Sequence, residues 1–283
     1  MAEIKRVGIL GSGIMGAGLA EVAARAGYEV VVRSRSLAAA NEMMATIDKG
    51  FRKAIERGKS TEEVRAAVLG RITATDQLTD VADCDLVIES VIEDLNIKLG
   101  LFAELDSVVK AGAILATNTS TLPVIELARA TQRPESVCGI HFFNPATVMT
   151  VVEVVRPITA SEETIATAME FATRCGKDVV ETKDHAGFIV NALLFPYLNN
   201  AVHMLERGTA PMESIDVAMK GGCNFPMGPF ALLDLVGLDT SVAILDALHA
   251  QFGDAHYAAA PTLRKMVADG QLGRKSKRGF YTY

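Results

Sequence analysis

Residues 6–16 read Arg6-Val7-Gly8-Ile9-Leu10-Gly11-Ser12-Gly13-Ile14-Met15-Gly16, and this stretch decides the fold. An apolar strand leads into a glycine turn, and residues 17–26 have the composition of a helix that ends at Gly27. The first glycine of such a turn permits the bend, the second lets a pyrophosphate approach, and the third lets helix and strand pack closely. We therefore predict a dinucleotide site, although a glycine turn without a ligand has the same local sequence. The predicted contacts are Gly11, Gly13, Ile14, Met15 and Gly16.

A second apolar strand, residues 29–32, ends in Arg33-Ser34-Arg35-Ser36. A site selective for NAD normally places Asp or Glu at this point to bind the ribose hydroxyls. Here there is no carboxylate, and the guanidinium groups of Arg33 and Arg35 with the hydroxyls of Ser34 and Ser36 would suit the 2′-phosphate of NADP. The turn therefore predicts a preference for NADP(H), with NAD(H) bound through other contacts as the alternative.

The composition is that of an ordinary globular protein. The chain has 283 residues, 49% of them hydrophobic, and a formal net charge of −6, so nucleic acid is not an expected partner. No apolar run is long enough for a membrane span, and Met1–Arg6 leads directly into the first strand without room for a signal peptide. The cysteines have neither metal-ligand nor disulfide spacing. They are Cys84, Cys138, Cys175 and Cys223. We expect a cytoplasmic protein with reduced thiols and no metal.

Strands and helices alternate through the first two thirds of the chain. This alternation predicts an α/β domain over residues 1–184, built on a doubly wound, mostly parallel sheet. From residue 185 the pattern is helical, which predicts an all-helical domain over residues 185–283 whose apolar faces also pack against a partner chain. The further expected strands are 72–74, 84–90, 113–116, 137–142, 149–155 and 178–180. The expected helices are 37–58, 61–69, 97–110, 123–130, 162–175, 189–207, 212–221, 229–251 and 262–269.

His141 and Glu153 are the candidate acid/base pair. His141 opens the run His141-Phe142-Phe143-Asn144-Pro145, and Glu153 lies inside the β-branched run Val151–Val155. Burying a carboxylate in such a run is costly unless a group partners it, and an imidazole is well suited to do so. The two residues therefore predict an oriented general acid/base pair. A core histidine beside an edge-strand glutamate is the alternative.

Taken together, the motifs resemble those of the L-3-hydroxyacyl-CoA dehydrogenases, in particular the short single-function form that includes the 3-hydroxybutyryl-CoA dehydrogenases. The resemblance spans nearly the whole chain and keeps the order of the motifs. They are residues 11–16, Asn118-Thr119-Ser120, residues 141–145, Gly187-Phe188-Ile189-Val190-Asn191, Pro226-Met227-Gly228-Pro229, Gly273-Arg274-Lys275-Ser276 and Gly279-Phe280-Tyr281.

The resemblance implies a Rossmann-like domain, a helical domain that forms the substrate cleft and a homodimer interface, and reversible hydride transfer at C3 of a short-chain 3-hydroxyacyl-CoA. It implies that His141 exchanges the proton of the 3-hydroxyl while Glu153 holds the second ring nitrogen. Ser120 and Asn191 are expected to bind the reacting oxygens, and Asn144 is expected near the nicotinamide.

The resemblance also assigns residues that contact the cofactor and residues that contact the CoA moiety. Glu93, Lys98, Ser120 and Lys275 align with cofactor contacts. The basic face of residues 49–57, including Lys53 and Arg57, lies where the CoA moiety is expected.

Each of these residues has a plainer interpretation. Ser120 could cap the helix that begins near Pro123. Asn191 could be an exposed helix residue, and Lys98, Lys275 and the basic face could be solvated charges.

Three other functions stay open at this point. They are a dehydrogenase for a carrier-bound acyl group, a silent dinucleotide-binding protein, and a 3-hydroxyacid dehydrogenase with a catalytic lysine. Residues 187–202 contain no lysine, which weakens the last.

Overall fold

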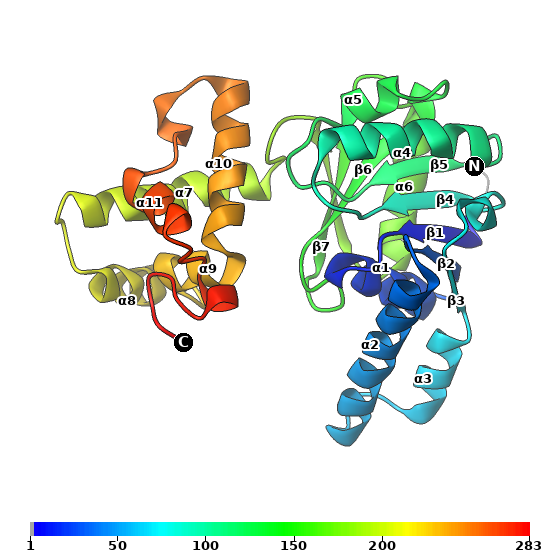
Figure 1. Ribbon diagram of the computed structural model, residues 1–283, viewed down its shortest axis with the longest axis horizontal. Helices are drawn as coiled ribbons and strands as arrows, with labels where there is room; N and C mark the ends of the chain where they lie inside the picture. Colours follow the sequence, from blue (N-terminus) through cyan, green and yellow to red (C-terminus); the bar gives the residue numbers. More distant parts are fainter. Residues whose placement is uncertain (1–2) are drawn as a thin grey trace. The chain divides into compact units, whose positions relative to one another are not determined.

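The computed structural model describes residues 3–283 and divides into two compact units between Asp184 and His185. The first unit is built on one sheet of eight strands (Figure 1). The prediction that no signal peptide precedes the first strand rests in part on Met1 and Ala2, which lie outside the described residues. None of the helices within residues 3–283 is both long and apolar enough to cross a membrane.

The sheet has the strand order β3-β2-β1-β4-β5-β6-β7-β8, and its first six strands are parallel. β7 pairs antiparallel with β6, and β8 pairs parallel with β7. The predicted mostly parallel, doubly wound sheet is therefore confirmed. The strands are β1 (Arg6–Leu10), β2 (Glu29–Arg33), β3 (Ile72–Thr75), β4 (Leu86–Glu89), β5 (Ile114–Thr117), β6 (Val137–Phe142), β7 (Val151–Arg156) and β8 (Asp178–Lys183).

Helices cover both faces of this sheet. Cys138 and Ile140 of β6 belong to the apolar core that α1, α2 and α6 share with the strands. Gly139 lies between them and faces the other way, towards Val124 of α5. Because side chains alternate along a strand, both faces of β6 are buried, as is usual for a parallel sheet. The helices are α1 (Ile14–Arg25), α2 (Leu37–Glu56), α3 (Glu62–Leu69), α4 (Leu95–Val108), α5 (Val124–Arg129) and α6 (Glu162–Arg174), with short 3₁₀ turns at η1 (Leu78–Val81) and η2 (Pro134–Ser136).

The helix starts in this unit follow the local sequence. Ser36, Thr61, Asp94 and Ser161 each accept a backbone N–H from the first turn of α2, α3, α4 and α6. Such caps satisfy amides that have no partner inside the helix. The residue that precedes α1 is Gly13, which has no side chain to do this. The amides at the start of α1 are therefore left without a side-chain cap.

The glycine turn has the geometry that its sequence predicts. Gly11 has a φ of +111°, and a Cβ on Gly16 would collide with the carbonyl oxygen of Gly11. A Cβ on Gly13 would meet no atom within 4 Å. Gly11 and Gly16 therefore allow the tight bend and the close packing of α1, whereas Gly13 faces open space where a ligand can approach.

The second unit is helical. Phe195, Leu198, Phe230, Leu245 and Leu263 bring its helices together in one core. Its helices are α7 (Val190–Glu206), α8 (Met212–Cys223), α9 (Pro229–Val236), α10 (Leu238–Phe252) and α11 (Pro261–Ala268), with 3₁₀ turns at η3 (Ala255–Tyr257) and η4 (Arg274–Ser276). The predicted all-helical architecture is confirmed.

One predicted helix of this unit was wrong. Residues 229–251 form two helices, because Gly237 has φ 105° and ψ 130° and interrupts the run between α9 and α10. A residue with this backbone conformation cannot continue a helix.

The carboxyl-terminal segment is anchored to this unit by a buried carboxylate. Asp234 is 1% exposed and accepts the backbone N–H groups of Phe280 and Tyr281 at 2.9 and 2.8 Å. A Cβ on Gly279 would collide with the Asp234 carboxylate. The motif Gly279-Phe280-Tyr281 therefore has a structural basis within the unit.

Candidate active site

The carboxyl ends of the parallel strands meet at one edge of the sheet, and backbone hydrogen bonds continue past the strand ends there. Gly11 donates to the carbonyl of Arg33 at 2.9 Å, and Asn118 donates to that of Glu89 at 2.8 Å. The chain proceeds from β1 outward to β2 and β3 on one side and to β4, β5 and β6 on the other. In open α/β sheets ligands bind where the strand order changes direction in this way, beyond the carboxyl ends of the strands.

His141 and Glu153 lie opposite each other on the antiparallel strands β6 and β7. The His141 Nδ1 and Glu153 Oε2 atoms are 2.7 Å apart, and the two residues are 4% and 0% exposed. Because a carboxylate accepts, this contact favours the tautomer in which Nδ1 carries the proton and donates it. The Phe143 ring lies 4.5 Å from the imidazole, centroid to centroid, and restricts its movement further.

Ser120 lies in the turn after β5, and its neighbours hold that turn against the sheet. The Asn118 side chain accepts the backbone N–H of Phe142 at 2.9 Å, which ties this turn to the end of β6 close to His141. Ser120 does not cap α5. The carboxylate of Asp184 accepts the first amides of that helix, from Val124 and Ile125, at 3.0 and 2.7 Å.

Glu93 and Lys98 are joined in an ionic cluster in which Lys98 is buried and the Glu93 side chain is 41% exposed. Lys98 is 1% exposed, and its ammonium lies 2.9 Å from oxygens of both Glu89 and Glu93. Glu93 also accepts hydrogen bonds from Thr119 Oγ1 at 2.5 Å and from the backbone N–H of Ser120 at 3.0 Å. Burial raises the pKa of the Glu93 carboxyl, but the Lys98 charge and these hydrogen bonds outweigh it and hold that pKa below its usual range. Lys98 is therefore not a solvated charge.

The turn after β2 is linked to the glycine turn. Ser34 is 7% exposed, and its hydroxyl lies 2.8 Å from that of Ser12. Arg33 Nε is buried and has no hydrogen-bond partner among residues 3–283, whereas Arg35 is exposed. Ser36 caps α2, so its hydroxyl is already engaged with the amide of Ala39. A buried donor without a partner is costly and fits an anionic ligand.

The loop after β6 carries Asn144, which is exposed. Lys177 holds this loop by donating from its ammonium to the carbonyls of Ala146 and Met149 at 2.6 and 2.7 Å. Gly18 of α1 approaches the same loop so closely that a Cβ would lie 3.0 Å from the Cβ of Ala146. The loop with Asn144 therefore packs against the helix that follows the glycine turn.

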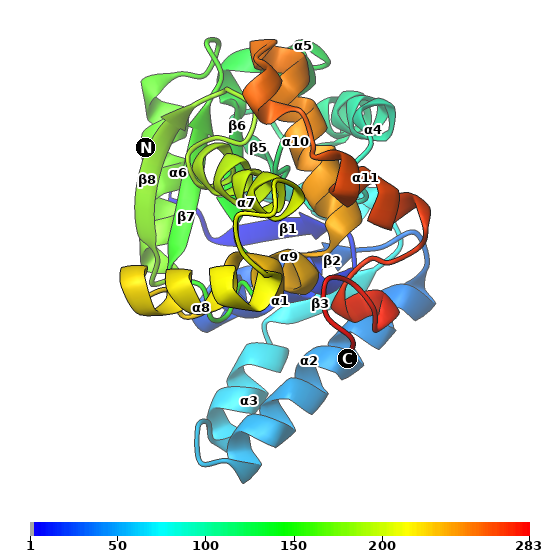
Figure 2. The same cartoon turned by 90° about the vertical axis from the view of Figure 1, so that its left-hand side faces the viewer.

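Helices α2 and α3 project together from the sheet (Figure 2). Lys49, Lys53 and Arg57 recur every four residues along α2 and are exposed. Side chains at this spacing share one face of a helix. The structure thus presents Lys53 and Arg57 to solvent on one cationic face.

Asn191 and Lys275 belong to the second unit. Asn191 lies in the first turn of α7 and is 8% exposed, so it is not an exposed helix residue. Lys275 is 46% exposed, and its ammonium lies 2.5 Å from the Asp239 carboxylate.

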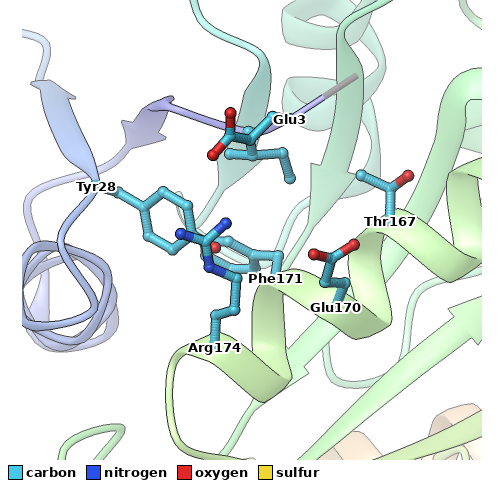
Figure 3. A pocket seen from close by; sticks show the side chains of 7 residues that line it. Glu3, Tyr28, Thr167, Glu170, Phe171 and Arg174 are labelled. Atoms are coloured by element: carbon cyan, nitrogen blue, oxygen red, sulfur yellow. The ribbon is translucent and has the colours of Figure 1, made fainter. Parts of the chain in front are cut away.

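One hollow of the first unit lies away from these residues. It has a volume of about 300 Å³ and lies at the amino ends of β1 and β2, beside α6 (Figure 3). The Arg174 guanidinium stacks 5.2 Å from the Tyr28 ring there, and burial raises the pKa of that tyrosine to about 12. This is the edge of the sheet opposite to the candidate site.

Residues 6–185 match the family model described as 3-hydroxyacyl-CoA dehydrogenase, NAD binding domain, and residues 187–283 match its C-terminal domain. The chain belongs to the 3-hydroxyacyl-CoA dehydrogenase family. It is accordingly an enzyme, a nicotinamide-dependent oxidoreductase.

Relatives within the 3-hydroxyacyl-CoA dehydrogenase family are similar over their full length. A 3-hydroxybutyryl-CoA dehydrogenase of Mycobacterium tuberculosis is 48% identical over 282 residues, which are 99% of each chain. The crystal structure of FadB2 from that organism has a TM-score of 0.97 with 100% of each chain covered. That of (S)-3-hydroxybutyryl-CoA dehydrogenase PaaH1 from Ralstonia eutropha has a TM-score of 0.97 at 39% identity, with 99% of each chain covered.

The sequence analysis missed two residues of the candidate site in this dehydrogenase, Glu89, which binds Lys98, and Asp184, which caps α5. It quoted Asn118 within a motif but predicted no role for it, and the structure shows that its side chain joins the turn after β5 to β6. For Glu89 a signal was present, because it is a carboxylate at the end of the apolar strand Leu86–Ile88. As with Glu153, a carboxylate buried beside apolar residues requires a partner, which predicts a positively charged or hydrogen-bonding group next to it.

Proposed function

We propose that this enzyme transfers hydride reversibly between NADP(H) and C3 of a short-chain 3-hydroxyacyl-CoA, with 3-hydroxybutyryl-CoA and acetoacetyl-CoA as the simplest pair. The observation that carries the proposal is the buried His141–Glu153 pair at the cofactor edge of the sheet. The relatives named 3-hydroxybutyryl-CoA dehydrogenases support the substrate, since they match over the full chain.

The mechanism assigns proton transfer to His141. In oxidation its Nε2 takes the proton of the 3-hydroxyl, and in reduction the imidazolium returns it. Glu153 accepts from Nδ1, so it fixes the tautomer and stabilises the imidazolium that forms. The bound nicotinamide supplies or accepts the hydride.

Ser120 and Asn191 are proposed to bind the substrate oxygen, and Asn144 to lie near the nicotinamide. A donor aimed at an oxygen that gains negative charge stabilises the transition state more than the ground state. The backbone of Ser120 is already fixed by Glu93, which favours such a role. Asn191 is 8% exposed in the first turn of α7.

The residues present fit a dinucleotide. Gly13 faces open space, and the start of α1 has no side-chain cap, so its amides are suited to a pyrophosphate. Ile14 and Met15 open this helix, and Glu93, Lys98 and Lys275 are retained as proposed cofactor residues. The preference for NADP(H) is supported by Arg33, Ser34 and Arg35, and in particular by the buried Arg33 Nε that no other described group binds. We propose that the 2′-phosphate binds there.

The first test measures acetoacetyl-CoA reduction with NADPH and NADH side by side. We expect a higher kcat/KM with NADPH, and we expect the double variant Ser34→Asp, Arg35→Ile to favour NADH because the new carboxylate repels the phosphate. A wild-type preference for NADH would reject the phosphate site and leave the dehydrogenase assignment intact. Absence of turnover with both cofactors would contradict the assignment itself.

We further propose that the enzyme is a cytoplasmic homodimer associated through its helical unit. The buried, unpaired thiols of Cys84 and Cys138 suit a reducing compartment. In the helical unit Leu193 and Val217 are 72% and 68% exposed, which leaves apolar surface for a partner. Light scattering at micromolar concentration is expected to give twice the mass of the chain, and a monomer would contradict the proposal.

A further inference from the structure

Glu89 is a fully buried carboxylate at the carboxyl end of β4, with apolar neighbours before it on the strand. Its Oε1 accepts the backbone N–H of Val91 at 2.6 Å and the Lys98 ammonium at 2.9 Å. Its Oε2 accepts from Thr117 Oγ1 at 2.8 Å and again from Lys98 at 2.9 Å. Four hydrogen bonds from three elements therefore converge on one side chain, and the proposed reaction has no step for it.

Two routes lead from Glu89 to the turn that holds Ser120. In the first, Glu89 fixes Lys98, Lys98 pairs with Glu93, and Glu93 accepts the backbone N–H of Ser120. In the second, Thr117 donates to Glu89 and accepts the backbone N–H of Thr119 at 3.1 Å. The first route ends at the backbone of Ser120 and the second at that of Thr119, the residue before it. A displaced Glu89 would thus shift Ser120 through two independent contacts.

Charge explains why a second carboxylate is needed. The Lys98 ammonium is buried, and Glu93 alone could neutralise it. If Glu93 were the single counter-charge, the Lys98 ammonium would neutralise more of its negative charge. Glu93 would then be a weaker hydrogen-bond acceptor for Thr119 and Ser120. Sharing Lys98 with Glu89 leaves Glu93 with negative charge to hold the turn.

We propose that Glu89 is a positioning residue, which acts through Lys98, Glu93 and Thr117 to fix Ser120 for substrate binding. This inference rests on the proposed function, since Ser120 is the substrate contact there. It predicts that Glu89 controls turnover without touching the substrate or the cofactor.

The matched control is Asp85, one residue before the amino end of the same strand. Its carboxylate accepts from Lys110 at 2.6 Å and from the backbone N–H groups of Lys5 and Arg6 at 2.8 and 2.9 Å. Glu89 and Asp85 therefore each bind a lysine and main-chain amides. They differ in burial, since the Asp85 side chain is 20% exposed and that of Glu89 is not exposed, and Asp85 lies at the edge of the sheet away from the site.

The experiment compares Glu89→Gln, Asp85→Asn and wild type. Glu89→Gln keeps the side-chain size, and Lys98 retains Glu93, so no uncompensated charge is buried. We expect kcat to fall about 10–100-fold, as when other outer positioning groups are lost, and cofactor KM to rise as well, because Lys98 and Glu93 are proposed cofactor residues. Asp85→Asn is expected to leave both constants near the wild-type values. Equal kinetic losses in the two variants would overturn the inference.

The second route is tested without touching Glu93, because removing both Glu89 and Glu93 would leave the buried Lys98 ammonium without a counter-charge. We expect Thr117→Val to lower kcat as Glu89→Gln does, and an unchanged kcat would contradict the route through Thr117. Thr117→Val probes the second route with little change of volume, and it serves if Glu89→Gln does not fold.

A readout without turnover separates this inference from the proposed function. The amide proton of Ser120, hydrogen-bonded to a carboxylate, is expected downfield in the NMR spectrum, and it should move upfield in Glu89→Gln but not in Asp85→Asn. A Ser120 resonance that does not move would overturn the inference. A wild-type enzyme inactive on acetoacetyl-CoA whose Ser120 resonance responds as expected would contradict the proposed function alone.

Discussion

The imidazole of His141 is buried, and Glu153 holds one of its ring nitrogens. A histidine that is 4% exposed with Nδ1 held 2.7 Å from a carboxylate has a fixed ring orientation and tautomer. The antiparallel pairing of β6 and β7 places the two side chains directly opposite each other. Strand register therefore creates the acid/base pair.

His141→Ala and Glu153→Gln are expected to lower kcat by about 10²–10⁴-fold, the range typical of general acid–base catalysis, with little change in cofactor affinity. The first variant removes the proton carrier, and the second leaves the imidazolium without its counter-charge. Steady-state kinetics together with a cofactor-binding titration check this. The matched control is His203→Ala, which breaks a His–Glu pair 2.9 Å long between His203 and Glu206 on α7. Near-normal turnover in either site variant would contradict the mechanism.

Single residues differ in how far their sequence predicts their surroundings. Glu153 was predicted because an apolar run surrounds it on both sides. Glu89 has such a run on one side only, and the lysine that compensates it lies nine residues later on another element. The cap of α5 could not be predicted, since Asp184 lies about 60 residues from the amides that it binds. Local patterns report burial, whereas these partners depend on how the strands are ordered.

At the scale of elements, α2 is amphipathic, with a buried and a charged face. Met43, Ile47 and Phe51 are buried, whereas Lys53 and Arg57, which directly follows the helix, are exposed. Periodicity predicted this helix to within two residues, because apolar side chains recur at helical spacing. The break at Gly237 escaped prediction, since an apolar pattern continues across it.

Charge reversal on this helix tests whether it binds the CoA nucleotide. Lys53→Glu, Arg57→Glu is expected to raise the KM for acetoacetyl-CoA about tenfold or more, because two attractions for phosphate become repulsions. The KM for a short acetoacetyl thioester without the nucleotide should not change. Lys220→Glu on α8 carries half of this change in net charge and controls for added negative charge elsewhere on the chain. An unchanged KM for acetoacetyl-CoA in the double variant would favour a carrier-bound substrate.

At the scale of the whole molecule, buried or paired carboxylates link stability to pH. Burial raises the pKa of Asp85, but the hydrogen bond from Lys110 and those from the amides of Arg6 and Lys5 outweigh it, so the pKa is lowered from its usual value. A carboxyl whose folded pKa is lowered stabilises the protein above its unfolded pKa. That stabilisation is lost as the pH falls through the folded pKa.

Asp85→Asn is therefore expected to destabilise the protein at pH 7 by on the order of 1 kcal/mol, through weaker hydrogen bonds at the start of β1 and β4. Below about pH 4 the carboxyl of the unfolded wild-type chain takes up a proton first, so the difference between variant and wild type should shrink as the pH falls towards the lower folded pKa. Urea unfolding at pH 7 and at pH 3.5 measures both values. A difference that grows on acidification would contradict the lowered pKa, because a group with a raised folded pKa gives the opposite trend. The same unfolding curves also test whether Asp85→Asn, the control for Glu89→Gln, is folded under the conditions of the assay.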